Sequence, residues 1–310
     1  MASTQHLQIA GRAVRVSSLD KVFYPGCGFT KGEVIDYYIR IAPVLLDHLR
    51  GRAVTLKRYP DGVRGEFFYE KQCPSHAPEW VRTTPVKKGD GSVIHYCLLD
   101  DLPSLVWAAN LANLEFHPFL HRARAPTRPT ALMFDLDPGP PAGIGDCARV
   151  ALRLRDLFAA LDLLCFPKTS GSKGLQLVVP LNGTLSYRRT KPFAHAVAQT
   201  LAARFPGEIV AEMKKSVREG KVFIDWSQND DGKTTVCAYS LRARETPTVS
   251  TPLRWEEVEK AGEHPGAAAV AFTATEVVAR VKVLGDLHAP VLVLRQTLPR
   301  LAALRGLGLP

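Results

Sequence analysis

The stretch Ala131-Leu-Met-Phe-Asp-Leu-Asp137 ends in alternating apolar and acidic residues and is followed at once by Pro138-Gly139-Pro140-Pro141. Successive side chains of a β-strand point to opposite faces, so Asp135 and Asp137 should share one face and the apolar residues the other. The proline-rich segment should end the strand soon after the two acids. Two carboxylates this close repel each other unless a cation lies between them, and their oxygens suit Mg²⁺ or Mn²⁺. The stretch therefore predicts a β-strand that ends in a metal site.

A second stretch with a similar pattern lies at Lys221-Val-Phe-Ile-Asp-Trp226. As a strand it would bury Val222, Ile224 and Trp226 on one face and present Asp225 on the other. An acid within an apolar strand is costly unless it is paired or binds a metal. Asp-x-Asp alone is equally compatible with exposed carboxylates at a loop edge, but the third acid favours a two-metal site. Such a site supports phosphoryl or nucleotidyl transfer, because the ions activate the attacking oxygen and neutralise the leaving group.

The net charge favours an anionic partner. The 310 residues include 40 Lys and Arg against 30 Asp and Glu, which gives a formal charge of +10. This balance favours nucleic acid over a neutral metabolite, although a basic surface without a specific partner would give the same count.

Cysteine usage and the absence of targeting signals indicate the compartment. The six cysteines, at positions 27, 73, 97, 147, 165 and 237, form no Cys-x-x-Cys pair and lack histidine partners at zinc spacing. We expect them to be reduced thiols. The N-terminus has no charged segment followed by an apolar one, and no run of about 18 apolar residues occurs. The sequence therefore predicts a cytoplasmic, nucleoid-associated protein without a membrane segment.

Capping signals and hydrophobic periodicity predict hairpins mixed with helices. Thr30-Lys-Gly-Glu33 is a capping box followed by apolar residues at helical spacing, which predicts a helix over about 31–49. The stretch Arg122–Pro129, rich in Arg and Pro, is typical of a linker. We expect an α+β fold with mixed or antiparallel sheets flanked by helices, in two closely packed halves. The halves would span about 1–125 and, with the catalytic residues, 126–250, before a helical segment at 251–310.

The other expected elements follow the same signals. They are strands at 53–59, 66–70, 93–99 and 114–117, a helix at 102–111, a strand at 130–137, a helix at 146–161, strands at 163–168 and 174–180, a helix at 189–204, strands near 208–213, 220–227 and 234–242, and a helix that begins at the capping box Thr273-Ala-Thr-Glu276.

Three further groups of residues could contact a nucleotide. The loop Lys168-Thr-Ser-Gly-Ser-Lys-Gly174 could surround a triphosphate with N–H groups, although such a stretch is more often a polar turn. Arg242 and Arg244, two apart on an expected strand end, would point the same way, as phosphate-pairing groups or as a surface stripe. The adjacent aromatics Phe67-Phe68-Tyr69 cannot all face one core, so at least one could stack on a nucleobase unless they cover a neighbouring helix.

A set of motifs follows in order along nearly the whole chain. They are Arg58-Tyr-Pro-Asp-Gly62 with Phe67-Phe68, Leu114-Glu-Phe-His117, Phe134-Asp-Leu-Asp-Pro138, Thr169-Ser-Gly-Ser-Lys-Gly174, Gly220-Lys-Val-Phe-Ile-Asp-Trp-Ser-Gln228 and Tyr239-Ser-Leu-Arg-Ala-Arg244. No single motif is decisive, but the set is highly specific. In these motifs the chain resembles the polymerase domain of bacterial DNA ligase D, within the archaeo-eukaryotic primase superfamily.

The resemblance implies a primase-like fold and a metal-dependent polymerase that extends a primer 3′-hydroxyl by one or a few nucleotides, often ribonucleotides, in short-gap filling or end joining. It implies that Asp135, Asp137 and Asp225 bind two Mn²⁺ or Mg²⁺ ions and that NTPs or dNTPs are substrates. The other implied roles are Lys57, Ser170, Ser172, Lys173, Arg218, Arg242 and Arg244 on the incoming triphosphate, His117 and Gln228 near it, Phe67 and Phe68 on the template, and Lys21 and Lys31 on the 5′-phosphate across a gap.

The implied partners are DNA with gaps or double-strand ends. Because no ligase or nuclease domain accompanies these motifs, we expect a separate ligase and the Ku end-binding protein to act with the chain.

Two other functions stay open at this point. Haloacid-dehalogenase-like phosphatases also place Asp-x-Asp after an apolar strand, but they ordinarily do so near the start of the domain and without the Pro138-Gly139 that follows here. A non-catalytic DNA-end-binding module would explain the basic charge, but its carboxylates would repel phosphate in the absence of a metal.

Overall fold

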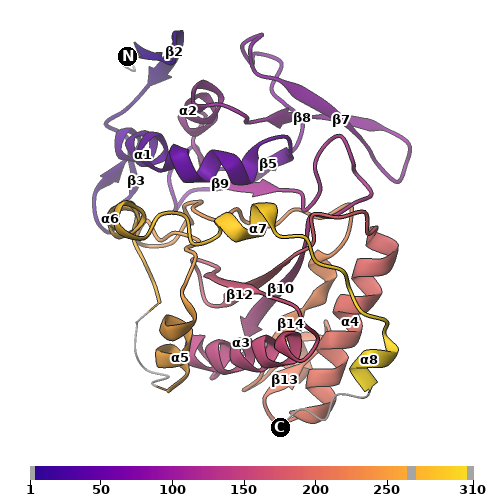
Figure 1. Ribbon diagram of the computed structural model, residues 1–310. Coiled ribbons are helices and arrows are strands. Elements are labelled where there is room, and N and C mark those ends of the chain that lie inside the picture. The colour runs from indigo at the N-terminus through magenta and orange to yellow at the C-terminus, as the bar shows by residue number, and fades with distance from the viewer. Residues whose placement is uncertain (1–3, 264–269, 306–310) are drawn as a thin grey trace. The chain divides into compact units, whose positions relative to one another are not determined.

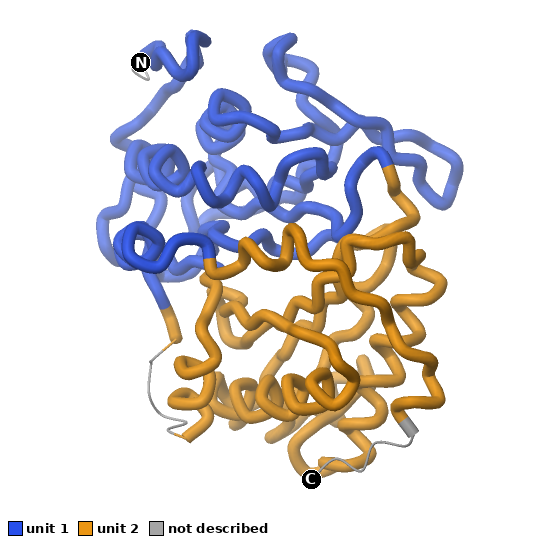
Figure 2. Tube along the Cα trace, viewed as in Figure 1, with its two compact units in different colours: residues 1–124, 234–250, 272–286 blue, residues 125–233, 251–271, 287–310 orange. Residues whose placement is uncertain are grey.

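The structure is a computed structural model that describes residues 4–263 and 270–305 (Figure 1). The chain divides into two compact units (Figure 2). Unit 1 comprises residues 1–124, 234–250 and 272–286, and unit 2 comprises residues 125–233, 251–271 and 287–310. The first boundary falls within the expected linker, but neither unit is continuous in sequence, unlike the expected halves. None of the helices in the described ranges is long and apolar enough to cross a membrane.

Unit 1 is built on a five-stranded sheet in which β5 pairs antiparallel with β6, β8 and β9, while β7 pairs with β8. Two small hairpins, β1–β2 and β3–β4, precede it, and α1 packs against α2 and α6 (Figure 1). The bounds are β1 Thr4–Ile9, β2 Arg12–Ser17, β3 Val22–Tyr24, β4 Phe29–Thr30, α1 Lys31–Leu49, β5 Ala53–Arg58, β6 Phe68–Glu70, β7 Thr83–Lys87, β8 Val93–Leu98, α2 Leu102–Asn110, β9 Asn113–Pro118 and α6 Ala274–Leu284.

Helix α1 is set by its cap and by one buried face. Thr30 Oγ1 accepts a hydrogen bond from Glu33 N, and the Glu33 carboxylate accepts one from Thr30 N, so the predicted capping box forms. On the buried face, Tyr38 donates its hydroxyl hydrogen to the Leu114 carbonyl at 2.5 Å, and its ring centroid lies 4.8 Å from that of Phe116. Helix α1 therefore fixes strand β9, which carries part of the candidate site.

Unit 2 contains a second five-stranded sheet in the order β11-β12-β10-β14-β13, antiparallel except for the β13–β14 pair. Helices α3 and α4 both pack against β10, and α5 packs on α3. The bounds are β10 Ala131–Pro138, α3 Ile144–Ala159, β11 Phe166–Thr169, β12 Leu175–Pro180, α4 Tyr187–Arg204, β13 Ile209–Val210, the 3₁₀ turn η1 Lys215–Val217, β14 Val222–Asp225, the 3₁₀ turn η2 Trp226–Gln228, α5 Trp255–Glu263, α7 Ala289–Val293 and α8 Ala302–Arg305.

Strand β10 is anchored by its apolar face, as its sequence predicts. Leu132, Phe134 and Leu136 are fully buried, and the Phe134 ring centroid lies 5.4 Å from that of Phe158 in α3. Burial of these side chains fixes the register of the strand, because a shift by one residue would turn them away from the core. The acidic residues between them consequently project from the opposite face.

The predicted α+β class with antiparallel sheets is confirmed, and most predicted elements are present with ends shifted by a few residues. The strand predicted at 234–242 is wrong, because this segment forms only single bridges, from Thr234 to Phe119 and from Leu241 to Val249. The chain turns at Tyr239, whose φ of 66° lies in the left-handed region and interrupts an extended run.

The expectation of six reduced thiols is wrong for two of them. Cys73 and Cys97 form a disulfide that joins the segment after β6 to strand β8, with 5.2 Å between their Cα atoms. They are 24 residues apart in sequence, and the fold brings them together. Spacing along the chain therefore gives no signal of this pair. The other four cysteines are free thiols.

Candidate active site

Three carboxylates share one face of the sheet in unit 2. Asp135 of β10 and Asp225 of β14 lie directly opposite each other in the antiparallel pair, and Asp137 follows two residues along β10. Directly paired residues, and residues two apart on one strand, project from the same face. The sheet thus brings the three predicted metal ligands to one side of two adjacent strands.

Asp135 lies in an unfavourable environment for an isolated carboxylate. Its Oδ1 atom is buried without a hydrogen-bond partner. Burial raises the pKa of Asp135 to about 7, and the nearby charges of Asp137 and Asp225 add to this effect. A divalent cation would bind the unsatisfied oxygen and offset the repulsion between the acids. The buried Oδ1 of Asp135 therefore has the chemistry of a ligand for a hard metal ion.

Asp225 is held by its own chain. Its carboxylate accepts hydrogen bonds from Ser227 N at 2.8 Å, Ser227 Oγ at 2.6 Å and Gln228 Nε2 at 2.8 Å. In the part of the chain that the structure describes, no three Asp, Glu, His or Cys side chains converge closely enough to hold a metal ion. Binding of one ion by all three acids would therefore require Asp225 to give up some of these hydrogen bonds.

Two residues that were not predicted as site residues, Lys168 and Gln176, continue the acidic row that Asp135 and Asp225 form across the sheet. Lys168 of β11 pairs with Gln176 of β12, and Gln176 pairs with Asp135, so the row runs from β11 to Asp225 of β14. Lys168 is buried, and its Nζ donates a hydrogen bond to Gln176 Oε1. A hydrogen bond with Gln176 and the charge of Lys168 partly oppose the rise in the pKa of Asp135 that burial causes. The signal for Lys168 was its position at the end of an apolar strand.

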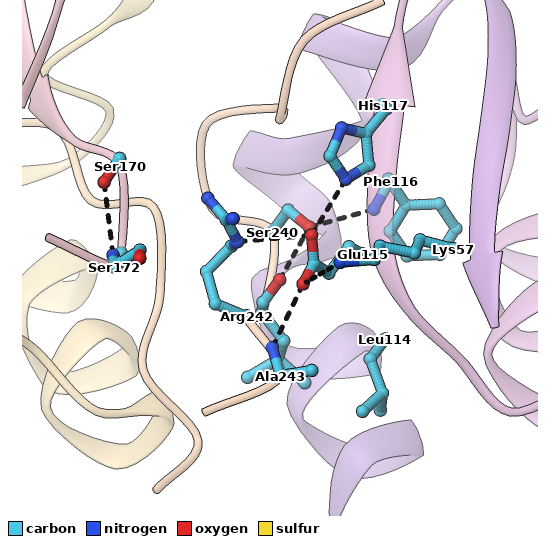
Figure 3. A network of polar contacts seen from close by, with 12 residues as sticks. Lys57, Leu114, Glu115, Phe116, His117, Ser170, Ser172, Ser240, Arg242 and Ala243 are labelled. Carbon is cyan, nitrogen blue, oxygen red and sulfur yellow. Dashed lines mark hydrogen bonds and ion pairs between the residues drawn. The ribbon is translucent and has the colours of Figure 1, made fainter. Parts of the chain in front are cut away.

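The predicted phosphate loop forms the turn between β11 and β12. Ser170 Oγ accepts hydrogen bonds from Ser172 N and Gly174 N, each at 3.2 Å, and Figure 3 includes the first of these. A Cβ atom at Gly174 would lie 1.9 Å from Leu136 O, so only glycine permits this close approach to β10. The loop therefore lies against the acidic strand, with Lys173 exposed to solvent.

Arg218 lies beside the same strands. Its guanidinium carbon is 3.7 Å from the ring centroid of Phe223, which pairs with Asp137, and its Nη2 donates to Met213 O at 2.6 Å. Gly139 permits this arrangement, because a Cβ atom there would lie 1.9 Å from Arg218 O. Arg218 thus lies over the ring of a residue that pairs with Asp137, and its contact with a triphosphate stays a prediction.

In unit 1, three predicted nucleotide-binding residues surround one buried carboxylate (Figure 3). Glu115 of β9 lies 3.5 Å from Lys57 Nζ, 2.9 Å from His117 Nε2 and 3.2 Å from Arg242 Nε. Arg244 is close enough to Lys57 for its charge to lower the lysine pKa, after the larger effect of burial. Glu115 was not among the predicted site residues, although an acid within the apolar run Leu114-Glu-Phe-His117 is a signal for a paired or functional carboxylate.

Phe67 and Phe68 are exposed, as stacking on a template requires, but they contact different cations. The Phe67 ring centroid is 4.2 Å from Lys57 Nζ, and the Phe68 ring centroid is 5.1 Å from the guanidinium carbon of Arg58. The β5–β6 register pairs Tyr69 with Lys57 and Phe68 with Arg58. Because adjacent pairs project from opposite faces, Tyr69 and Phe68 lie on different sides of the sheet.

Lys21 and Lys31 differ in exposure. Lys31 is buried and donates to Ser17 O at 2.7 Å, whereas Lys21 is exposed and lies 2.8 Å from Asp61. Burial, together with the charges of Lys21 and Arg58, lowers the pKa of Lys31 to about 8. The two lysines therefore share an electropositive region, and their role towards a 5′-phosphate stays a prediction.

Comparison with known proteins identifies the family. Residues 30–288 match the family model described as LigD, primase-polymerase domain. The chain is 42% identical over 282 residues to the multifunctional non-homologous end joining protein LigD of Mycolicibacterium smegmatis, across 90% of this chain and 36% of that protein. It is 34% identical over 273 residues to the bifunctional non-homologous end joining protein LigD of Bacillus subtilis, across 88% of this chain and 43% of that protein.

The structure is also similar to that of the polymerase domain from Mycobacterium tuberculosis ligase D in complex with DNA. The TM-score is 0.83, with 39% sequence identity over 89% of this chain and 97% of that one. The fold is therefore of the archaeo-eukaryotic primase type, as the sequence motifs predicted. The chain belongs to the LigD primase-polymerase domain family. It spans about a third of the length of the mycobacterial relative.

Proposed function

We propose that this chain is a metal-dependent nucleotidyltransferase that extends a primer 3′-hydroxyl by one or a few nucleotides, commonly ribonucleotides, in short-gap filling or end joining. Family membership supports polymerase chemistry. The observation that carries the proposal is the direct pairing of Asp135 with Asp225, with Asp137 on the same face of the sheet.

In this proposal Asp135, Asp137 and Asp225 hold Mn²⁺ or Mg²⁺. The buried, unpartnered Oδ1 of Asp135 supports the assignment, because it is a ligand atom that the protein itself does not satisfy. When bound, the ions would activate the primer hydroxyl and neutralise charge on the triphosphate. Asp225 would exchange hydrogen bonds from Ser227 and Gln228 for this role, which would release the Gln228 amide towards the nucleotide.

The remaining residues of the proposed nucleotide site bind and orient the NTP or dNTP. The loop at 170–174 offers backbone N–H groups, hydroxyls and an exposed ammonium group to phosphate oxygens. The arginines can pair with phosphates through two parallel N–H donors. The residues that the family resemblance implies for this role are Lys57, His117, Ser170, Ser172, Lys173, Arg218, Gln228, Arg242 and Arg244.

We propose DNA with gaps or double-strand ends as the second substrate. The similar domain of M. tuberculosis was solved in complex with DNA. Phe67 and Phe68 would stack on template bases for about 1–3 kcal/mol per base, and Lys21 and Lys31 would bind a 5′-phosphate. In end joining, the extended end must then be ligated, so we propose a DNA ligase and the Ku end-binding protein as partners.

A primer-extension assay on a gapped template with a 5′-phosphate tests this function. We expect Mn²⁺-dependent addition of one or a few nucleotides, and a loss of at least about 100-fold in Asp135→Ala and Asp137→Ala. Asp156→Ala, which removes a partly exposed carboxylate of α3 outside the acidic row, is the matched control and should extend normally.

Other outcomes would replace the proposal. Absence of extension by the wild-type chain, with both ribo- and deoxyribonucleotides, would exclude the polymerase. Release of phosphate from small phosphomonoesters would favour a phosphatase, and tight binding to DNA ends without extension would favour a non-catalytic repair module.

A further inference from the structure

One oxygen of Glu115 is bound on several sides by the protein. Glu115 is 1% exposed. Its Oε1 lies 3.5 Å from Lys57 Nζ and accepts hydrogen bonds from Tyr59 Oη at 3.3 Å and from Ala243 N at 3.2 Å. The carboxylate therefore joins β5 and β9 to the segment that follows Tyr239.

The second carboxylate oxygen of Glu115 contacts two more side-chain nitrogens of the site. Glu115 Oε2 lies 2.9 Å from His117 Nε2 and 3.2 Å from Arg242 Nε. Although burial alone would raise it, the pKa of Glu115 is held well below its ordinary value by the hydrogen bond from His117 and the charge of Arg242. Glu115 is therefore ionised at neutral pH, and because its partners are protein groups it acts through them.

Aromatic rings fix Lys57 on its other sides. Its Nζ lies 4.2 Å from the ring centroid of Phe67, 5.3 Å from that of Tyr59 and 5.5 Å from that of Tyr69. In the sheet, Lys57 of β5 pairs with Tyr69 of β6 on one side and with Glu115 of β9 on the other. Its ammonium group thus has little freedom, and its orientation depends on the carboxylate.

The cations of this cluster would repel one another without a negative charge among them. Arg242 and Arg244 both lower the pKa of Lys57, whereas Glu115 opposes this effect and that of burial. In Figure 3, Arg242 directs Nε towards Glu115 while its terminal nitrogens point away from the carboxylate. The cluster therefore combines several cationic side chains with one internal negative charge that holds them together.

We propose that Glu115 is a positioning residue that holds Lys57, His117 and Arg242 together as one preassembled group for the phosphates of the incoming nucleotide. This inference rests on the proposed function, because it describes how the proposed substrate is bound. It assigns Glu115 no contact with the substrate and no part in the chemical step.

The pH dependence of nucleotide affinity distinguishes this positioning role from a purely structural role of Glu115. The charged and titratable groups around Lys57 include Glu115, His117, Arg242, Arg244 and the phenols of Tyr59 and Tyr69. Removal of the Glu115 charge would lower the pKa of Lys57 further, so the ammonium form would be lost at a lower pH. Nucleotide affinity should then fall with rising pH on the alkaline side, at a lower pH than in the wild type.

The test is steady-state primer extension across the neutral to alkaline pH range with Glu115→Gln, Glu115→Asp and a control, Glu70→Gln. Glu70 pairs with Arg58 at 2.9 Å on the opposite face of the same sheet, so the control also breaks a carboxylate–arginine pair. We expect Glu115→Gln to raise the nucleotide KM by about tenfold or more, with kcat changed by less than about threefold. In Glu115→Gln, the rise of the nucleotide KM at high pH (its basic limb) should begin at a lower pH than in the wild type. Glu115→Asp should restore the wild-type position of this limb. Glu70→Gln should match the wild type in KM, kcat and pH profile.

The inference is overturned if Glu115→Gln and Glu115→Asp lower kcat and raise KM equally with an unchanged pH profile. If Glu115→Gln does not fold, Lys57→Arg provides the second test, because its guanidinium stays charged throughout this range. The basic limb of KM should then disappear, and its persistence would overturn the inference.

Binding of inorganic triphosphate, measured by calorimetry, tests the role of Glu115 separately from the proposed polymerase function. Wild-type binding that weakens in Glu115→Gln with the same pH shift would support the inference even if no primer is extended. Equal binding by both proteins would overturn it even if the wild type is an active polymerase.

Discussion

At the scale of single residues, Asp135 of the proposed metal site opposes folding. The charged form of Asp135 is disfavoured in the folded chain by burial and by Asp137, so the carboxylate costs stability when no metal is bound. Lys168 and Gln176 reduce this cost but do not remove it. Residues kept in such an environment are typical of functional sites, where electrostatic strain is retained for activity.

This view predicts that Asp135→Asn stabilises the chelator-treated protein while abolishing primer extension. The gain should be on the order of 1 kcal/mol in the free energy of unfolding. Because the pKa is raised on folding, the folded chain binds more protons than the unfolded one between about pH 4 and 7, and the wild type loses stability as the pH rises through this window.

Chemical denaturation at several pH values measures this difference. The advantage of Asp135→Asn should be largest above about pH 7 and should vanish towards about pH 4. A variant that is less stable than the wild type at every pH would contradict the prediction.

At the scale of elements, the turn between β11 and β12 depends on one glycine. A Cβ atom at Gly174 would lie 1.9 Å from the backbone oxygen of Leu136, so Gly174→Ala must push the loop away from β10. We expect a loss of about 2 kcal/mol in stability and a raised nucleotide KM, because the loop and the acidic strand separate.

Gly207→Ala is the matched control, since a Cβ atom there would meet no atom within 4 Å. It should change stability by less than about 0.5 kcal/mol and leave KM unaltered. Equal effects of the two substitutions, in denaturation and in kinetics, would show that the loop position does not matter.

The elements also show what could be predicted from sequence. Helix α1 and strand β10 could be predicted, because a capping box and a buried apolar face are local patterns. The conformation of the segment 234–242 could not be predicted, because its apolar composition resembles that of a strand while the positive φ of Tyr239 depends on tertiary contacts. The Cys73–Cys97 disulfide was missed for the same reason, since the fold alone brings the two residues together.

The candidate site was predictable to the extent that a chemical signal lay within a motif. The three acids stood out as charges inside apolar strands, and the register of β10 with β14 confirms that they share a face. Glu115 and the pair Lys168–Gln176 were missed because their importance comes from pairing across strands, which no single stretch of sequence contains.

At the scale of the whole molecule, the charge of +10 predicts DNA binding that weakens steeply with salt. If exposed Lys21 contacts a 5′-phosphate, Lys21→Ala should lower the slope of log affinity against log salt by about 1 and remove the preference for a phosphorylated gap. Lys21 is the better target because Lys31 is buried against Ser17 O, and its loss would also disturb the fold.

Binding of gapped DNA with and without the 5′-phosphate, measured at several salt concentrations, checks this. Asp61→Asn removes the acid that pairs with Lys21 and should strengthen the phosphate preference. An unchanged preference in both variants would place the phosphate elsewhere.

The central claim is that Asp135, Asp137 and Asp225 together bind the catalytic ions. The most direct measurement is anomalous X-ray scattering from crystals grown with Mn²⁺ and a non-hydrolysable nucleotide. We predict manganese peaks at about 2.0–2.2 Å from oxygens of the three carboxylates, with Asp225 turned away from Gln228. Manganese bound elsewhere, or Asp225 still bonded to Ser227 and Gln228 in the nucleotide complex, would contradict the account.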